Sequence, residues 1–314
     1  MTDLQTAIAV AAVIAVTLVV AFNIREWSKA KKRIAQQQVA VVAEEPVISP
    51  VLERLLDPVL PSLIAESIAE LSWPSAISVS KIQHEIRGWR RVGSKPLAFG
   101  WRVAGHEEMQ AEPNAQEITG LSVGILLATR QGPLNAMEYS EWQESLMKLA
   151  GNLGAQVSIP SMTETLAKAR ALDQQCAAVD AQLTIAVTTM GVLSTAAIAS
   201  AAQAAGLESR GELRFGMGPL HQQRFSVFPG DRGMSLVLLC DVPRTLQPVA
   251  AFQEMQQAAQ TMAAVLSGSV TDEAGRPLAT LDFERIEEQI AQKAAQLAAM
   301  GIEPGAPIAQ RLFL

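Results

Sequence analysis

Side chains that could catalyse a reaction are present, but they do not fall into a catalytic pattern. No serine lies in a GxSxG nucleophile elbow, and no segment fits the phosphate-binding loop GxxxxGK[ST]. The segment GMGPLH at 216–221 holds a lone GxG, which is a weak nucleotide-binding signal. No motif supports a membrane-anchored hydrolase, so we expect no catalytic residues and predict that the protein is not an enzyme. Five carboxylates fall in a predicted turn and helix, where a solvated face is the ordinary reading: Asp272, Glu273, Glu284, Glu287 and Glu288.

Metal and redox chemistry also lack their usual residues. Cys176 and Cys240 lie far apart with no CxxC motif, so we expect two buried thiols and no disulfide. The three histidines are too scattered for a zinc or haem site, and we expect no metal, no cofactor and no small-molecule substrate. The formal net charge of −6 disfavours nucleic acid as the main partner, because such partners need a basic face. The histidines are His84, His106 and His221.

One segment is apolar enough to cross a membrane. Of the 314 residues, 49% are hydrophobic and only 4% are aromatic, and an apolar run over 7–22 is broken only by Thr17. With its flanks the run reaches the roughly 20 residues that a helix needs to span the hydrocarbon core. A cleaved signal peptide is the alternative, but it requires a basic start, whereas this one carries Asp3. We predict an uncleaved transmembrane helix within 1–24.

A basic collar follows this helix and sets its orientation. Residues 25–33 carry five basic side chains against one acid, Glu26. Because basic residues stay on the cytoplasmic side, we expect the N-terminus outside and the rest of the chain inside. Each basic residue near anionic lipid contributes about 1 kcal/mol to membrane contact. The collar consists of Arg25, Lys29, Lys31, Lys32 and Arg33.

The remainder of the chain reads as a linker followed by a duplicated unit. The stretch up to residue 60 is rich in proline and glutamine, which favours an extended tether. Residues 121–157 then match 234–270 at an offset of 113, and shorter matches lie on either side. A chance alignment of two alanine-rich regions is the alternative. We predict an anchor at 1–24, collar and linker at 25–60, a first unit at 61–177, a second at 178–300 and a C-terminal tail at 301–314.

Hydrophobic periodicity gives both units the same α+β architecture. The strands are expected to form a mostly antiparallel sheet with helices on one face. In the first unit, the third strand, somewhere in 106–119, is weak. In the second unit we expect strands at 182–188, 212–217, 224–228 and 235–240, helices at 194–205, 248–267 and 281–299, and two short strands within 267–280.

The uncovered face of the second sheet should be polar, but it carries apolar residues. Val237 and Leu239 fall on the side opposite the expected core, and Phe228 lies beside them. Exposed apolar strips usually mark binding surfaces, and this one suits an extended peptide or an amphipathic helix. The alternative is that the strip packs against the first unit or is covered on both sides. Thr184 and Arg214 fall on the same face.

The anchor, tether and second unit together resemble the ZipA family of bacterial cell division proteins. The resemblance lies mainly in 181–290, in the segments AAIASAAQAAGLESRGELRF (196–215) and GMSLVLLCDVPRTLQPVAAFQEMQQAAQTMAAVLSGSVTDEAGRPLATLDFERIEEQI (233–290). It implies that the exposed sheet face binds the C-terminal tail of FtsZ through Thr184, Arg214, Phe228, Val237 and Leu239.

Two departures qualify this resemblance. Glu212 and Arg214 stand near positions that the family fills with apolar residues, and the tether is shorter than is typical. In the first unit the aligned outward positions, Gly124 and Leu126, are smaller overall, so we do not expect the same groove there.

The functional hypothesis is therefore a membrane-anchored division adaptor. We expect a single-pass protein of the bacterial inner membrane, with a periplasmic N-terminus and cytoplasmic domains, at the division septum. Its partners would be the FtsZ tail and, through the anchor, membrane lipids. The alternative is a tandem-domain membrane scaffold that uses the same sheet face for a peptide of another envelope complex.

Overall fold

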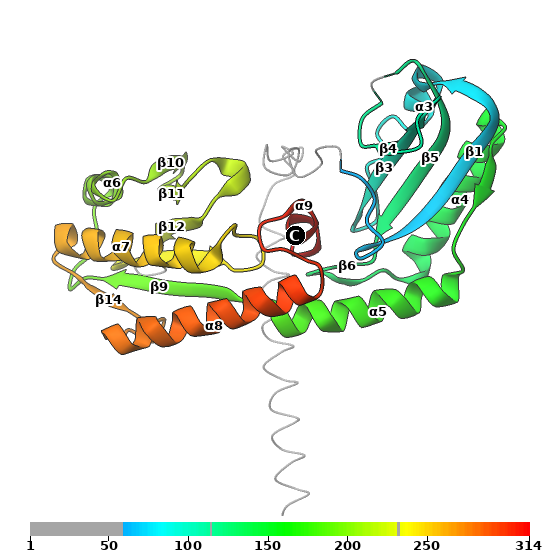
Figure 1. Cartoon of the computed structure of the whole chain (residues 1–314). Coiled ribbons are helices and arrows are strands. Elements are labelled where there is room, and N and C mark those ends of the chain that lie inside the picture. Colours follow the sequence, from blue (N-terminus) through cyan, green and yellow to red (C-terminus); the bar gives the residue numbers. More distant parts are fainter. Residues whose placement is uncertain (1–58, 114, 231–232) are drawn as a thin grey trace, which may run out of the picture. The chain divides into compact units, whose positions relative to one another are not determined.

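The computed structural model describes residues 59–113, 115–230 and 233–314, the side chain of His221 excepted. The predicted membrane helix, the collar and nearly all of the linker lie outside these residues. Within the described ranges, none of the helices combines the length and the apolar composition that a membrane span requires. The fold is α+β, built on two antiparallel sheets (Figure 1).

The first sheet has the strand order β2-β3-β5-β1-β8, with β4 paired to the end of β3. All its strand pairs are antiparallel. A separate two-stranded sheet pairs β6 with β7. The elements of this part of the chain are β1 Glu66–Ser78, α3 Val79–Glu85, β2 Arg91–Val92, β3 Lys95–Val103, β4 Met109–Gln110, β5 Glu117–Leu126, β6 Ala128–Thr129, β7 Gly132–Pro133, α4 Ala136–Leu153, β8 Gln156–Ser158 and α5 Met162–Val179.

The second sheet has the order β10-β11-β12-β13-β9-β14. The three predicted helices and the four longer predicted strands are confirmed to within a few residues, whereas β10 was not predicted. Only one full strand, β14, forms within 267–280, and it is joined to Pro277 by a single bridge. The elements are β9 Gln182–Thr188, α6 Thr195–Ala204, β10 Glu208–Gly211, β11 Arg214–Met217, the 3-10 turn η1 Leu220–Gln222, β12 Phe225–Pro229, β13 Ser235–Asp241, α7 Pro248–Leu266, β14 Ser269–Thr271 and α8 Thr280–Ala299.

Strand β3 holds a different place from the one that its sequence match predicts. One of the shorter sequence matches aligns 96–101 with 212–217, so it predicts that β3 is the counterpart of β11. In the structure β3 instead pairs directly with β5, as β12 pairs with β13. The weak strand expected within 106–119 is only the two-residue β4. Trp101 is paired with Leu121 of β5 on one side and with Gln110 of β4 on the other. Strand β4 therefore cannot separate β3 from β5.

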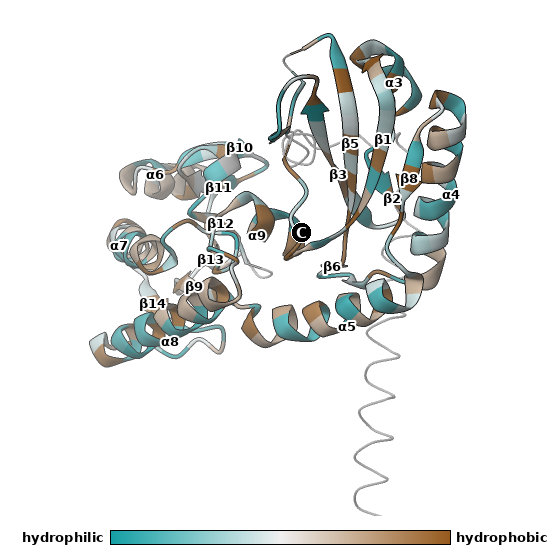
Figure 2. Ribbon diagram, turned by 45° about the vertical axis from the view of Figure 1, so that its right-hand side comes forward, coloured by the Kyte–Doolittle hydropathy of each residue, from teal (hydrophilic) through white to brown (hydrophobic). Residues whose placement is uncertain are grey.

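Helices bury one face of the second sheet. Phe252, Met255 and Met262 of α7 are fully buried, as their helical spacing predicts, and Pro248 starts this helix. They pack in one core with the inward strand residues, such as Leu236 and Leu238. Burying a side chain of this size contributes about 1.5–3 kcal/mol. Figure 2 shows polar and apolar residues alternating along α5 and α8, as expected for helices buried on one side.

The C-terminal segment is a helix that belongs to the first core. Residues 301–314 contain α9, Pro307–Leu312. Leu312 and Phe313 are each 1% exposed and pack with Leu297 and Ile302 against the core of the first sheet. A fragment that starts at residue 178 would therefore leave these side chains without their packing partners.

Candidate peptide-binding face of the second sheet

The sheet register places the predicted site residues on one face. Thr184 pairs with Leu239, and Leu239 pairs with Ser226. In the next row Val237 pairs with Phe228. Because alternate residues of a strand share a face, these side chains lie opposite the helix-covered core. We call this side the outer face.

The apolar residues of the outer face are only partly covered. Phe228, Val237 and Leu239 are half-buried, whereas Leu236 and Leu238, which alternate with them on β13, are fully buried. The apolar strip therefore remains accessible to a partner, although it runs along the middle of a sheet. Its half-buried state does not fit the alternative in which the strand is covered on both sides.

Arg214 lies next to the strip, and its guanidinium group packs over the aromatic ring of Phe228. Its guanidinium carbon is 5.9 Å from the centre of the Phe228 ring, a cation–π contact. Glu212 is not part of the strand that the sequence predicts there. Glu212 and Leu213 form a two-residue hairpin turn with φ of 49° and 59°, and strand β11 begins only at Arg214. Glu212 is thus displaced from the face position that the predicted strand assigned to it.

Thr184 is on the outer face, but its hydroxyl group is already engaged. It donates a hydrogen bond to the carboxylate of Glu273, in the loop between β14 and α8. Thr184 is therefore placed to contribute mainly packing to a ligand. The structure brings together all five residues predicted for this site, and it adds Ser226, which the sequence analysis did not single out.

A pocket of about 290 Å³ lies where β13 ends. Ser226 and Leu239 line it from the outer face, and Arg244 lines it from the loop after β13. Arg244 is half-buried and donates from Nε to Gln310 Oε1 of α9 over 3.1 Å. Sequence reasoning missed this pocket, because Gln310 lies 66 residues from Arg244 and belongs to a segment expected to be a tail.

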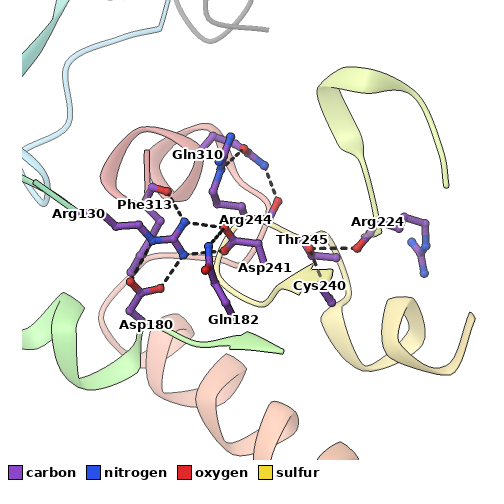
Figure 3. Close-up of polar contacts among 10 residues, drawn as sticks. All are labelled: Arg130, Asp180, Gln182, Arg224, Cys240, Asp241, Arg244, Thr245, Gln310 and Phe313. Atoms are coloured by element: carbon purple, nitrogen blue, oxygen red, sulfur yellow. Dashed lines mark hydrogen bonds and ion pairs between the residues drawn. The ribbon is translucent and has the colours of Figure 1, made fainter. Parts of the chain in front are cut away.

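Arg130 fixes the end of β13 through contacts with Asp241 (Figure 3). Its guanidinium donates two hydrogen bonds to Asp180, of 2.9 and 2.6 Å, and two to Asp241, of 2.6 and 2.8 Å. It also donates to the backbone oxygen of Phe313 over 2.8 Å. Burial alone would lower the pKa of Arg130, but the hydrogen bonds to Asp241 and Asp180 outweigh it and raise that pKa. One guanidinium therefore pairs with both carboxylates, and its single positive charge balances only one of their two negative charges.

The corresponding face of the first sheet is covered by the chain itself. A Cβ atom on Gly124 would come within 2.9 Å of Pro61, and one on Gly100 within 3.4 Å of Leu60. Residues 59–64 therefore cross this face where the glycines leave room. Leu126, which was expected to face outward, is completely buried. The absence of a side chain at Gly100 and Gly124 lets residues 59–64 pack closely on the sheet.

Glu66 holds this segment in place. Its carboxylate accepts a hydrogen bond from the backbone N–H of Ser62 and pairs with Arg311 of α9 at 2.5 Å. Glu66 and Arg311 are only 2% and 5% exposed. Burial raises the pKa of Glu66, and Arg311 offsets part of that rise. The segment 59–64 and helix α9 thus meet at one buried ion pair.

Comparison with known protein families finds a match that covers much of the second sheet. Residues 215–289 match the family described as ZipA, C-terminal FtsZ-binding domain. The protein is ZipA-like in this region. The match contains Phe228, Val237 and Leu239 of the outer face, whereas Arg214 directly precedes it and Thr184 lies well before it. A search of curated proteins found no match to the chain. In the part of the chain that the structure describes, no group of three or more His, Cys, Asp and Glu side chains is placed to hold a metal ion.

Proposed function

We propose that this protein is a non-enzymatic cell division adaptor that binds the C-terminal tail of FtsZ and tethers it to the inner membrane. The observation that carries the proposal is the coincidence of two findings. The ZipA-type match covers β11 to α8, and its central strands β12 and β13 present a half-buried apolar strip on the outer face. Peptide recognition on such a face needs no catalytic or metal-binding group.

The strip is suited to weak binding repeated many times. Phe228, Val237 and Leu239 already bury part of their surface in the sheet, so a docked peptide gains only the remainder. A single contact of this kind is modest, but many tails along one filament meeting many anchored copies bind with avidity. A micromolar affinity for one tail would be sufficient for tethering.

We also propose that the two sheets arose by duplication and that only the second binds the partner. Both read in the order strand, helix, antiparallel strands, helix, strand, helix, and α4 aligns with α7 at the offset of 113. The first sheet has no free outer face at Gly100 and Gly124, because residues 59–64 cover them. The expected stoichiometry is one tail for each chain.

In this proposal the first unit connects the membrane anchor to the binding unit. The predicted span at 1–24 and the collar at 25–33 lead into a linker that reaches the body at residue 59. Ser62 and Glu66 then fasten the chain to β1. The N-terminus would be periplasmic, both units cytoplasmic, and the protein would act at the septum.

The test is recruitment of FtsZ to membranes by the full-length protein. The chain is reconstituted in vesicles of bacterial lipids, and bound FtsZ filaments are measured by co-flotation. Filaments should float with vesicles that carry the protein, and FtsZ without its C-terminal tail should not. Equal flotation of tail-less FtsZ, or none of either form, would contradict the proposal; the second result would favour the tandem-domain scaffold for another peptide.

A further inference from the structure

The pocket at the end of β13 is continuous with the proposed tail-binding strip. Leu239 and Ser226 belong both to the outer face and to the pocket lining. A volume of about 290 Å³ is at the lower end of the range for small-molecule pockets, so it fits one side chain or one chain end. A peptide that contacts Leu239 on the outer face would therefore also lie at this pocket.

The pocket holds a guanidinium whose hydrogen-bonding capacity is only partly used by the described residues. Arg244 uses Nε for Gln310, and no described residue accepts a hydrogen bond or forms an ion pair with its two terminal nitrogens. Burial lowers the pKa of Arg244, and the carboxylate of Asp241, which also lines the pocket, offsets part of that fall. Both oxygens of Asp241 already accept hydrogen bonds from Arg130 (Figure 3). The guanidinium therefore keeps an unused pair of donors.

Three other polar side chains of the pocket are engaged within the protein. Arg224 lines the same pocket, but it is paired with Glu254 of α7. Gln182 donates to Asp241 over 3.3 Å, and Gln310 donates to the backbone oxygen of Arg244. Partial burial strengthens a charge-assisted hydrogen bond, and the planar fork of arginine matches the two oxygens of a carboxylate.

We propose that this pocket is a carboxylate subsite of the peptide groove, in which Arg244 binds an acidic side chain or the C-terminal carboxylate of the docked peptide. The inference rests on the proposed function and adds a polar anchor to an otherwise apolar face. Such an anchor fixes the direction and register in which the peptide lies, which apolar packing alone specifies poorly. It also makes binding depend on salt, because an ion pair at the half-exposed end of a groove is screened.

The experiment measures binding of the full-length protein, in detergent, to synthetic FtsZ tail peptides. One peptide is native, one has an amidated C-terminus, one has its acidic side chains replaced by the matching amides, and one carries both changes. The native peptide should bind Arg244→Gln about tenfold more weakly than wild type, a loss typical of one charge-assisted contact. The fully neutral peptide should bind both proteins equally, which also shows that the variant is folded. Arg170→Gln, on the exposed side of α5, is the charge-matched control and should bind like wild type.

The partly neutral peptides identify the source of the carboxylate. The one whose binding no longer depends on Arg244 has lost the group that the pocket recognises. If Arg244→Gln binds the native peptide as tightly as wild type does, or weakens the native and fully neutral peptides equally, the subsite is wrong while tail binding stands. If wild type binds none of the peptides, the proposed function fails, and the subsite fails with it.

Discussion

Replacing Arg130 with methionine should destabilise the fold markedly, because one guanidinium is the ion-pair partner of two carboxylates. Arg130→Met keeps most of the aliphatic bulk but removes all the hydrogen bonds to Asp180, Asp241 and the Phe313 carbonyl. The two carboxylates would then face each other without a cation. It would also remove the cation–π contact of Arg130 with the Phe313 ring, at 5.7 Å.

The exposure of the three side chains sets the expected size of the effect. Exposed ion pairs contribute about 0–1 kcal/mol, and breaking a fully buried one costs about 3–5 kcal/mol. The side chains of Arg130, Asp180 and Asp241 are 23%, 30% and 18% exposed, which is between these cases. We therefore expect Arg130→Met to lower the free energy of unfolding by about 2–3 kcal/mol.

Urea unfolding of residues 50–314, which form one compact unit, measures this loss. The midpoint should fall by about 1 M urea. In the Arg130→Met background, Asp241→Asn should lower the free energy of unfolding by less than it does in wild type, because there it relieves the repulsion between the two carboxylates. Arg170→Met is the control and should stay within about 0.5 kcal/mol of wild type. If Arg130→Met unfolds like this control, or if the two substitutions are additive, the network does not stabilise the fold.

Two further predictions concern the covered face and the thiols. Gly124→Ala should lower the free energy of unfolding by about 1–3 kcal/mol and speed proteolysis near residues 59–64, because its methyl group would collide with Pro61. The control is Gly151→Ala, whose added methyl group would meet nothing within 4 Å. Equal proteolysis of the two variants would refute the close packing of residues 59–64 on Gly124. Burial raises the pKa of Cys176 and of Cys240 to about 11, so at pH 8 both thiols should react with Ellman's reagent far more slowly in the native protein than in urea. Rapid reaction of either thiol in the native state would show that its site is open.

Local patterns were sufficient to predict the second sheet and its outer face. The alternation along Ser235–Asp241 separates buried Leu236 and Leu238 from half-buried Val237 and Leu239, and register extends that separation to Phe228. The apolar stripe of α7 was equally readable. These features depend on residues that are close in the sequence, so they appear as a hydrophobic periodicity of 2 in a strand or 3.6 in a helix.

Contacts between distant segments could not be read in the same way. Nothing in the spacing of Glu66 and Arg311, or of Arg130 and Asp241, indicates that the chain brings them together. The same is true of Pro61 on Gly124, which was seen only as a small residue in an apolar strand. The place of β3 beside β5 was not predicted either, because a local match of six residues does not determine which strand lies next to it.

The central claim is tested most directly by titrating residues 50–314 with an FtsZ tail peptide and following Leu239→Asp. This substitution puts a charge in the middle of the half-buried strip, next to Ser226 and Thr184. Leu281→Asp, at a site that is 63% exposed on α8, is the matched control. Wild type and Leu281→Asp should bind one peptide per chain with the same affinity, and Leu239→Asp should bind at least tenfold more weakly. Undiminished binding by Leu239→Asp, or two peptides per chain, would contradict a single groove on the outer face.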